Sequence, residues 1–160
     1  MKKILVASCL GMSLFAASSM AEDCITVEEL NVEFHNATTV YSNKEEKQEI
    51  VRFADFMKAT DIYAVIEGHT SSLDNATYNY DLSTKRAVKV MAELKKLGVD
   101  KSHIRAMGFG ESSPLYNNAT QEGAAKNRRV IAEVFNSAEE LDAYIKSEKS
   151  RIQDIVLLEQ

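Results

Sequence analysis

The sequence has few of the residues from which covalent cross-links and metal sites are built. It holds two cysteines and three histidines in 160 residues. Cys9 lies in an apolar N-terminal run, and Cys24 alone cannot form a disulfide framework. Because His35, His69 and His103 lie on separate predicted elements without the spacing of metal ligands, we expect no metal site. The stretch "GFGESS" lacks the third glycine of a dinucleotide loop, so we expect no cofactor.

A hydrophobic run long enough to cross a membrane is also missing. "MKK", an apolar stretch and small residues up to Ala21 have the order of a secretory signal, so residues 1–21 are predicted to be a signal peptide. The apolar run before Cys9 is too short for a lipoprotein signal. We therefore expect export to the periplasm without direct membrane insertion, a flexible segment at 22–29, and association with the outer membrane only through a partner.

An excess of positive charge is the third absence. Removal of Lys2 and Lys3 from the 19 basic residues leaves 17 against 24 acidic residues, a net charge of about −7 for the exported chain. This charge argues against nucleic acid or anionic lipid as the main partner.

The hydrophobic pattern alternates between strand and helix periods. Strands are predicted in "LNVEFHNATT", "DIYAVIEG", "SHIRAMGFG" and "RRVIAEVF", and helices in "NKEEKQEIVRFADFMKAT" and "YDLSTKRAVKVMAELKKLG". This order predicts an α+β domain of βαβαβ type over residues 30–136, with a mixed four-stranded sheet and helices packed on one face.

An extra amphipathic helix is predicted over 137–160. Ser137 and Glu140 form a capping box at its start. Two alternatives stay open for its apolar residues. They pack back onto the domain, or they form a short coiled coil for self-association or a protein partner. The residues are Leu141, Ile145, Ile152, Ile155 and Val156.

Four short motifs, taken in order, resemble the OmpA-like C-terminal domain family of peptidoglycan-binding modules. They are "IEGHT", "LSTKRA", "GFGESSP" and "NRRV", within a match from about Val32 to Phe135. The resemblance implies non-covalent binding of the diaminopimelate side chain of the peptide stem. In the family, an arginine binds the ligand's carboxylate and an aspartate after "GHT" binds its ammonium. Here the arginine position is Arg86, and the aspartate position holds Ser71.

The loss of the aspartate predicts weaker or altered binding. Hydrogen bonds to charged groups contribute about 1.5–3 kcal/mol and neutral ones about 0.5–1.5 kcal/mol, so affinity is expected to fall roughly tenfold. Asp74 is a candidate substitute anion. The resemblance also nominates Thr70, Asn79 and Arg128 as ligand-binding residues.

Each candidate has a structural alternative. In the structural alternative for Arg86, its guanidinium pairs with Asp81 or Glu93 on a solvated face. In the alternative for Asn79, the side chain shapes the start of the helix. At least one of Arg128 and Arg129 braces the terminal strand.

Two functional hypotheses follow. The first is a non-enzymatic periplasmic module that binds peptidoglycan. The second is a domain without wall binding that acts as an interaction or scaffolding module. His69, Ser71 and Asp74 contain the residue types of a hydrolytic triad, but nothing around them marks a nucleophile turn or an oxyanion hole.

Overall fold

The structure, a computed structural model, describes residues 28–158. The predicted signal peptide and Cys24 lie outside these residues. The elements follow one another as β1 (Asn31–Glu33), α1 (Glu46–Thr60), β2 (Tyr63–Gly68), α2 (Ala76–Lys96), β3 (Ile104–Gly108), α3 (Gln121–Asn127), β4 (Arg129–Phe135) and α4 (Ala138–Leu158). All the predicted strands and helices are present, and α3 is an additional helix.

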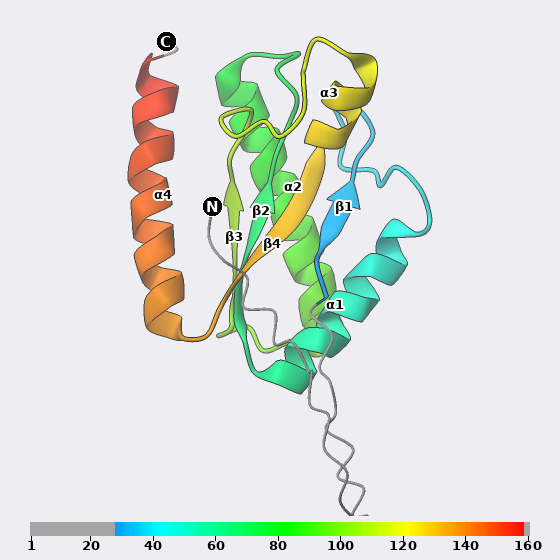
Figure 1. The fold of residues 1–160 in the computed structure, drawn as a ribbon, viewed down its shortest axis with the longest axis vertical. Helices are drawn as coiled ribbons and strands as arrows, with labels where there is room; N and C mark the ends of the chain where they lie inside the picture. Colours follow the sequence, from blue (N-terminus) through cyan, green and yellow to red (C-terminus); the bar gives the residue numbers. More distant parts are fainter. Residues whose placement is uncertain (1–27, 159–160) are drawn as a thin grey trace, which may run out of the picture.

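The strands form one mixed sheet in the order β1-β4-β2-β3. β2 and β3 are parallel, whereas β4 is antiparallel to both β1 and β2. The predicted α+β fold with a mixed four-stranded sheet is therefore confirmed. Because β1, β2 and β3 run in the same direction, their carboxyl ends and the start of β4 lie at one end of the sheet, with α3 beside them (Figure 1).

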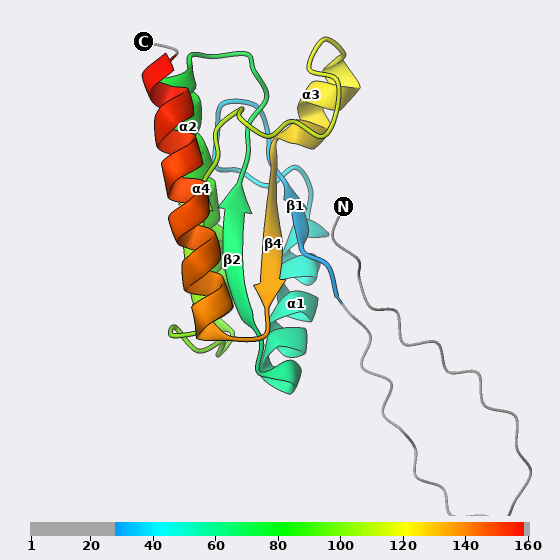
Figure 2. The same cartoon turned by 60° about the vertical axis from the view of Figure 1, so that its left-hand side comes forward.

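The two faces of the sheet carry two separate hydrophobic clusters. α2 runs behind the strands in Figure 1, and the larger cluster joins α1 and α2 to residues such as Ala64 and Ile66 of β2. The intervening Val65 belongs to the smaller cluster, with α4. Alternate residues of a strand point to opposite faces, so α4 covers the face that α1 and α2 leave open (Figure 2).

The packing of α4 agrees with the first of the two alternatives for this helix. Leu141 and Ile152 are buried in the smaller cluster, and Tyr144 and Ile145 pack against it. The Glu140 amide donates a hydrogen bond of 3.2 Å to the Ser137 hydroxyl, as in a capping box. The Glu140 carboxylate accepts from the Asn136 amide, one residue earlier than the box requires. Ile155 and Val156 lie outside the described side chains.

α2 begins one turn earlier than predicted. Asn75, which precedes the predicted helix in the sequence, is its N-cap, and the Asn75 side chain accepts a hydrogen bond of 2.9 Å from the Tyr78 amide. Asn79 thus lies inside the first turns of the helix. α2 also approaches β2 very closely, because a Cβ on Gly68 would stand 2.0 Å from the Ser83 carbonyl oxygen.

Candidate functional site

The candidate residues come together where loops from three strands meet. Residues 35–40 follow β1, residues 69–75 follow β2, and residues 109–120 follow β3 at the end of the sheet that also carries α3 (Figure 1). Arg128 precedes β4 at the same end, and Arg86 reaches this point from α2. The topology therefore assembles a site from segments that lie far apart in the chain.

Arg86 lies beneath these loops, with an exposed fraction of 0%. Its Nε donates a hydrogen bond of 2.9 Å to the Thr38 carbonyl, and its Nη2 donates one of 2.9 Å to the His35 carbonyl. A third, of 3.3 Å, runs from Nη1 to the His69 carbonyl. The guanidinium also lies 5.2 Å from the ring centroid of Phe34. Arg86 therefore joins the loop after β1 to the end of β2.

The partners of Arg86 are not the acidic residues that its structural alternative named. Neither Asp81 nor Glu93 bonds to it, and its hydrogen bonds in the described part of the chain all go to neutral carbonyls. Burial, together with the neighbouring positive charge of Arg128, lowers the pKa of Arg86 to about 10. The guanidinium remains charged at neutral pH, without a carboxylate among the described residues to balance it.

The loop at 35–40 is shaped and held by further contacts. It is closed by an antiparallel bridge between Phe34 and Tyr41, and Ala37 has a positive φ of 52°. Lys89 donates a hydrogen bond of 2.7 Å to the Thr39 carbonyl, and the Tyr41 hydroxyl donates one of 2.8 Å to Glu93. α2 thus fixes the loop at several points besides Arg86.

Thr70 and Ser71 are buried in the loop after β2, each with an exposed fraction of 3%. The Thr70 amide donates a hydrogen bond of 2.8 Å to the Gly110 carbonyl, which ties this loop to the one after β3. The Thr70 hydroxyl is buried without a hydrogen-bond partner among the described residues. Ser71 therefore lies below the surface of the site.

Asn79 holds the same loop from within α2. Its side-chain amide donates a hydrogen bond of 2.8 Å to the Asp74 backbone carbonyl and a second to the Glu111 carboxylate. With an exposed fraction of 2%, Asn79 occupies a bracing position. The Asp74 residue itself is exposed. Contact of either residue with a ligand stays a prediction.

A surface hollow of about 370 Å³ lies over this junction, and we call it the Arg128 hollow. Arg128 is half-buried at its wall, and its Nε donates a hydrogen bond of 3.3 Å to the Phe34 carbonyl. Of the six candidate residues, Arg128 is the one that lines it. The described lining consists of Asn36, Leu73, Asn118, Ala119, Thr120, Gln121, Ala124 and Arg128, and it includes no acidic residue.

The sequence analysis missed α3 and the residue that anchors it. Asn127 is fully buried, and its side-chain oxygen accepts hydrogen bonds from the amides of Leu115 and Tyr116. Its side-chain nitrogen donates to the Tyr116 carbonyl and the Asn118 side chain. Asn127 therefore fixes the segment that forms one wall of the Arg128 hollow. Two features of the sequence could have indicated this arrangement. Asn127 opens the motif "NRRV", and Thr120 is a residue type that commonly caps a helix, as it does for α3.

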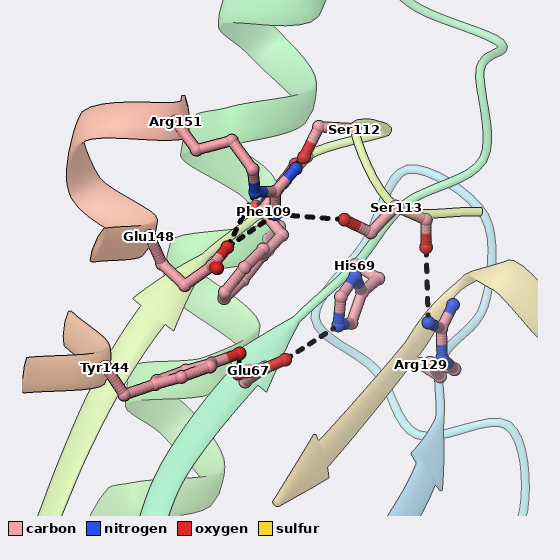
Figure 3. A network of polar contacts seen from close by, with 11 residues as sticks. Glu67, His69, Phe109, Ser112, Ser113, Arg129, Tyr144, Glu148 and Arg151 are labelled. Atoms are coloured by element: carbon pink, nitrogen blue, oxygen red, sulfur yellow. Dashed lines mark hydrogen bonds and ion pairs between the residues drawn. The ribbon is translucent and has the colours of Figure 1, made fainter. Parts of the chain in front are cut away.

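A second polar network, whose contacts the sequence did not predict, lies on the α4 side of the sheet (Figure 3). The Tyr144 hydroxyl donates a hydrogen bond of 2.5 Å to Glu67 Oε1, and Glu67 Oε2 lies 3.6 Å from His69 Nε2. The His69 ring stacks on Phe109 at 5.1 Å. Burial lowers the pKa of His69, and Arg129 and Arg151 lower it further against the opposing effect of Glu67.

Ser113 connects this network to α4 and to β4. Its hydroxyl accepts a hydrogen bond of 3.2 Å from Arg151 of α4, and its carbonyl accepts one of 3.3 Å from Arg129 (Figure 3). Arg129 has an exposed fraction of 3% and bonds within the fold, so it occupies the bracing position expected of one arginine of the pair. Arg151 is also paired with Glu148 at 2.7 Å.

The described residues contain no group of three histidine, cysteine, aspartate or glutamate side chains suited to a metal ion. His69 faces Glu67 and Phe109 in the network of Figure 3. Within residues 28–158, no helix combines the length and the apolar character needed to cross a bilayer.

Comparison with protein families gives a match over this region. A family model described as the OmpA family matches residues 35–128, which is more than half of the chain. Those residues include all six candidate site residues.

Curated relatives match the same part of the chain. The chain is 46% identical over 88 residues to outer membrane porin F of Pseudomonas aeruginosa, covering 54% of this chain and 25% of that protein. It is 42% identical over 80 residues to the peptidoglycan-binding protein ArfA of Mycobacterium tuberculosis, covering 49% of this chain and 24% of that protein. The chain thus spans about a quarter of the length of these relatives.

Solved structures share the fold. The peptidoglycan-associated lipoprotein from Burkholderia pseudomallei superposes with a TM-score of 0.62 at 24% identity, over 66% of this chain and 89% of that chain. The cell wall anchor of the T6SS from Pseudomonas aeruginosa superposes with a TM-score of 0.59 at 27% identity, over 68% and 81%.

Proposed function

Because the chain belongs to the OmpA family, we propose that it binds peptidoglycan without covalent chemistry, as a non-enzymatic module of the periplasm. The ligand group is a diaminopimelate-type end of the peptide stem, and the binding surface is the Arg128 hollow with Arg86 beneath it. The observation that carries the proposal is the pair of neighbouring guanidinium groups, Arg86 and Arg128, at the junction of three loops.

The charge of this pair supports an acidic ligand. Arg86 is held by three carbonyl groups, which are dipoles and do not neutralise its charge. Arg128 adds a second positive charge at the surface of the same site. A carboxylate placed in the hollow would relieve the repulsion between the two cations, and a guanidinium fork is well suited to bind it. A peptide stem supplies such carboxylates.

Relatives whose names state a function support the same ligand. ArfA is named as a peptidoglycan-binding protein, and the superposed structures include a peptidoglycan-associated lipoprotein and a cell wall anchor. An outer-membrane location through a partner remains part of this proposal, as do the predicted signal peptide and periplasmic export.

Co-sedimentation with isolated cell-wall sacculi tests the proposal. The exported chain should sediment with sacculi, and Arg128→Gln should reduce the bound fraction about tenfold or more because a surface cation of the hollow is lost. Arg105→Gln is the matched control, since Arg105 is an exposed arginine of β3 that bonds to the carbonyl groups of Lys101 and Ser102. A wild-type chain that stays in the supernatant would contradict the proposal.

The second candidate is an interaction or scaffolding module without wall binding. Ser71 in place of the family aspartate favours it. The buried apolar residues of α4 weaken it, because Leu141 and Ile152 are already used within the domain. A protein partner retained equally by the wild type and by Arg128→Gln, with no sedimentation on sacculi, would decide for this candidate.

A further inference from the structure

The charges around the Arg128 hollow are one-sided. Arg128 lines it, Arg86 lies close enough for the two charges to repel, and the hydrogen bonds of Arg86 reach only carbonyls in the described part of the chain. The remaining described lining consists of amide, hydroxyl and apolar side chains. Such a surface attracts an anion strongly and offers a cation no charged partner.

The acidic side chains near the hollow either bond to other residues or do not line it. Glu111 accepts a hydrogen bond from the Asn79 side chain, which holds the loop after β2. Asp81 lines a different hollow, between α2 and residues 37–40. Asp74 is exposed and is not among the residues that line the Arg128 hollow. In this arrangement the described acids do not replace the charge that the family has at Ser71.

Ser71 itself has little to offer an ammonium group. It is buried to an exposed fraction of 3%, and it is not among the described residues that line the hollow. A hydroxyl would in any case supply a neutral acceptor where an aspartate supplies a full negative charge.

From these three observations we infer that the Arg128 hollow binds the side-chain carboxylate of the diaminopimelate-type ligand and makes no charged contact with the ammonium beside that carboxylate. The inference rests on the proposed function and narrows its ligand class from a zwitterion to a carboxylate. Acylation of the amine in a cross-link removes its positive charge. For such a hollow, an acylated amine is therefore equivalent to an absent one. The chain therefore binds cross-linked and uncross-linked stems with similar affinity.

Calorimetry with four synthetic stem tripeptides tests this inference on the exported chain. The first carries unmodified meso-diaminopimelate. In the second a hydrogen replaces the side-chain amine, in the third that amine is acetylated, and in the fourth the side-chain carboxylate is an amide. The second and third should bind within about threefold of the first, whereas the fourth should bind about tenfold more weakly or worse.

Gln121→Glu gives a matched variant in which a carboxylate lines the hollow, because Gln121 is an exposed residue of its lining. This variant should bind the unmodified peptide about tenfold more tightly than the peptide without the amine. Equal binding of those two peptides by the variant would contradict the claim that the hollow lacks only an acidic partner for the ammonium.

The outcomes separate the inference from the proposed function. A tenfold loss with the second or third peptide would overturn the inference, while sedimentation on sacculi would still support wall binding. Retained binding of the fourth peptide would overturn it as well. If none of the four binds and sacculi leave the chain in the supernatant, both the inference and the proposed function are wrong.

Discussion

The Tyr144 hydroxyl donates a hydrogen bond of 2.5 Å to Glu67 Oε1, and this contact joins α4 to β2 across the smaller hydrophobic cluster. Glu67 has an exposed fraction of 4%, so its carboxylate depends on partners inside the fold. Burial and the neighbouring Glu67 charge raise the pKa of Tyr144 well above its usual value, so the phenol keeps its proton and remains a donor.

Tyr144→Phe should lower the free energy of unfolding by about 1.5–3 kcal/mol, because a buried carboxylate loses a donor. Urea unfolding followed by circular dichroism measures the effect. Tyr80→Phe is the matched control, since Tyr80 is an exposed residue of α2. In a Glu67→Gln background the effect of Tyr144→Phe should shrink, and an unchanged effect would contradict the pairing.

Arg86→Met should destabilise the fold by about 3 kcal/mol or more, because the carbonyls of His35, Thr38 and His69 lose a charged donor. Residues 35–40 should then show faster amide hydrogen exchange than in the wild type. Loss of sacculus binding by this variant would therefore report on the loop as well as on the ligand. A variant as stable as the wild type would show that these hydrogen bonds contribute little.

Stability should fall on acidification through His69. An unfolded histidine has a pKa of about 6.5, and burial lowers the pKa of His69 in the fold. Below about pH 6.5 the unfolded chain takes up the proton first, so the folded state loses stability until the lower folded pKa is reached. The difference between wild type and His69→Gln isolates this effect, with a limiting slope of about 1.4 kcal/mol per pH unit. A pH-independent difference would contradict it.

Gly68→Ala should disrupt the packing of α2 on β2, since the new methyl group would stand 2.0 Å from the Ser83 carbonyl oxygen. We expect a loss of several kcal/mol or a failure to fold, read by thermal unfolding and by yield of folded protein. At Gly98 a new methyl group would have its nearest neighbouring atom 3.8 Å away, and φ is +93°. Gly98→Asn should cost only about 1 kcal/mol there, because asparagine tolerates positive φ.

Local patterns were enough to predict most of the fold. Apolar spacing within "YDLSTKRAVKVMAELKKLG" marks α2, and the period-two pattern of "RRVIAEVF" marks β4. The start of α2 was missed because the turn chemistry of Asn75 and its capping role look alike in a sequence. α3 was missed because a helix of seven residues contains too few turns to show a period.

The candidate site residues came from the family motifs, and their contact with a ligand stays a prediction; of the six, Arg128 lines the hollow. The structure places Arg86, Ser71, Asn79 and Arg128 near one end of the sheet, a placement that the motifs alone did not give. The sequence predicted for Arg86 either a ligand carboxylate or an acidic partner on a solvated face, whereas the structure buries its side chain under residues 35–40. Those contacts join positions about 50 residues apart, which no local pattern contains.

The sequence by itself determined where most of the strands and helices run, because their periods, caps and glycines act over a few neighbouring residues. It also determined the net negative charge and the serine at position 71. Tertiary structure alone decided that Arg86 is a buried support, that Arg128 lines the surface of the site, and that α4 covers the second face of the sheet. The physical reason is that burial and charge pairing depend on which distant segments meet, and that is settled only when the sheet and its loops pack together.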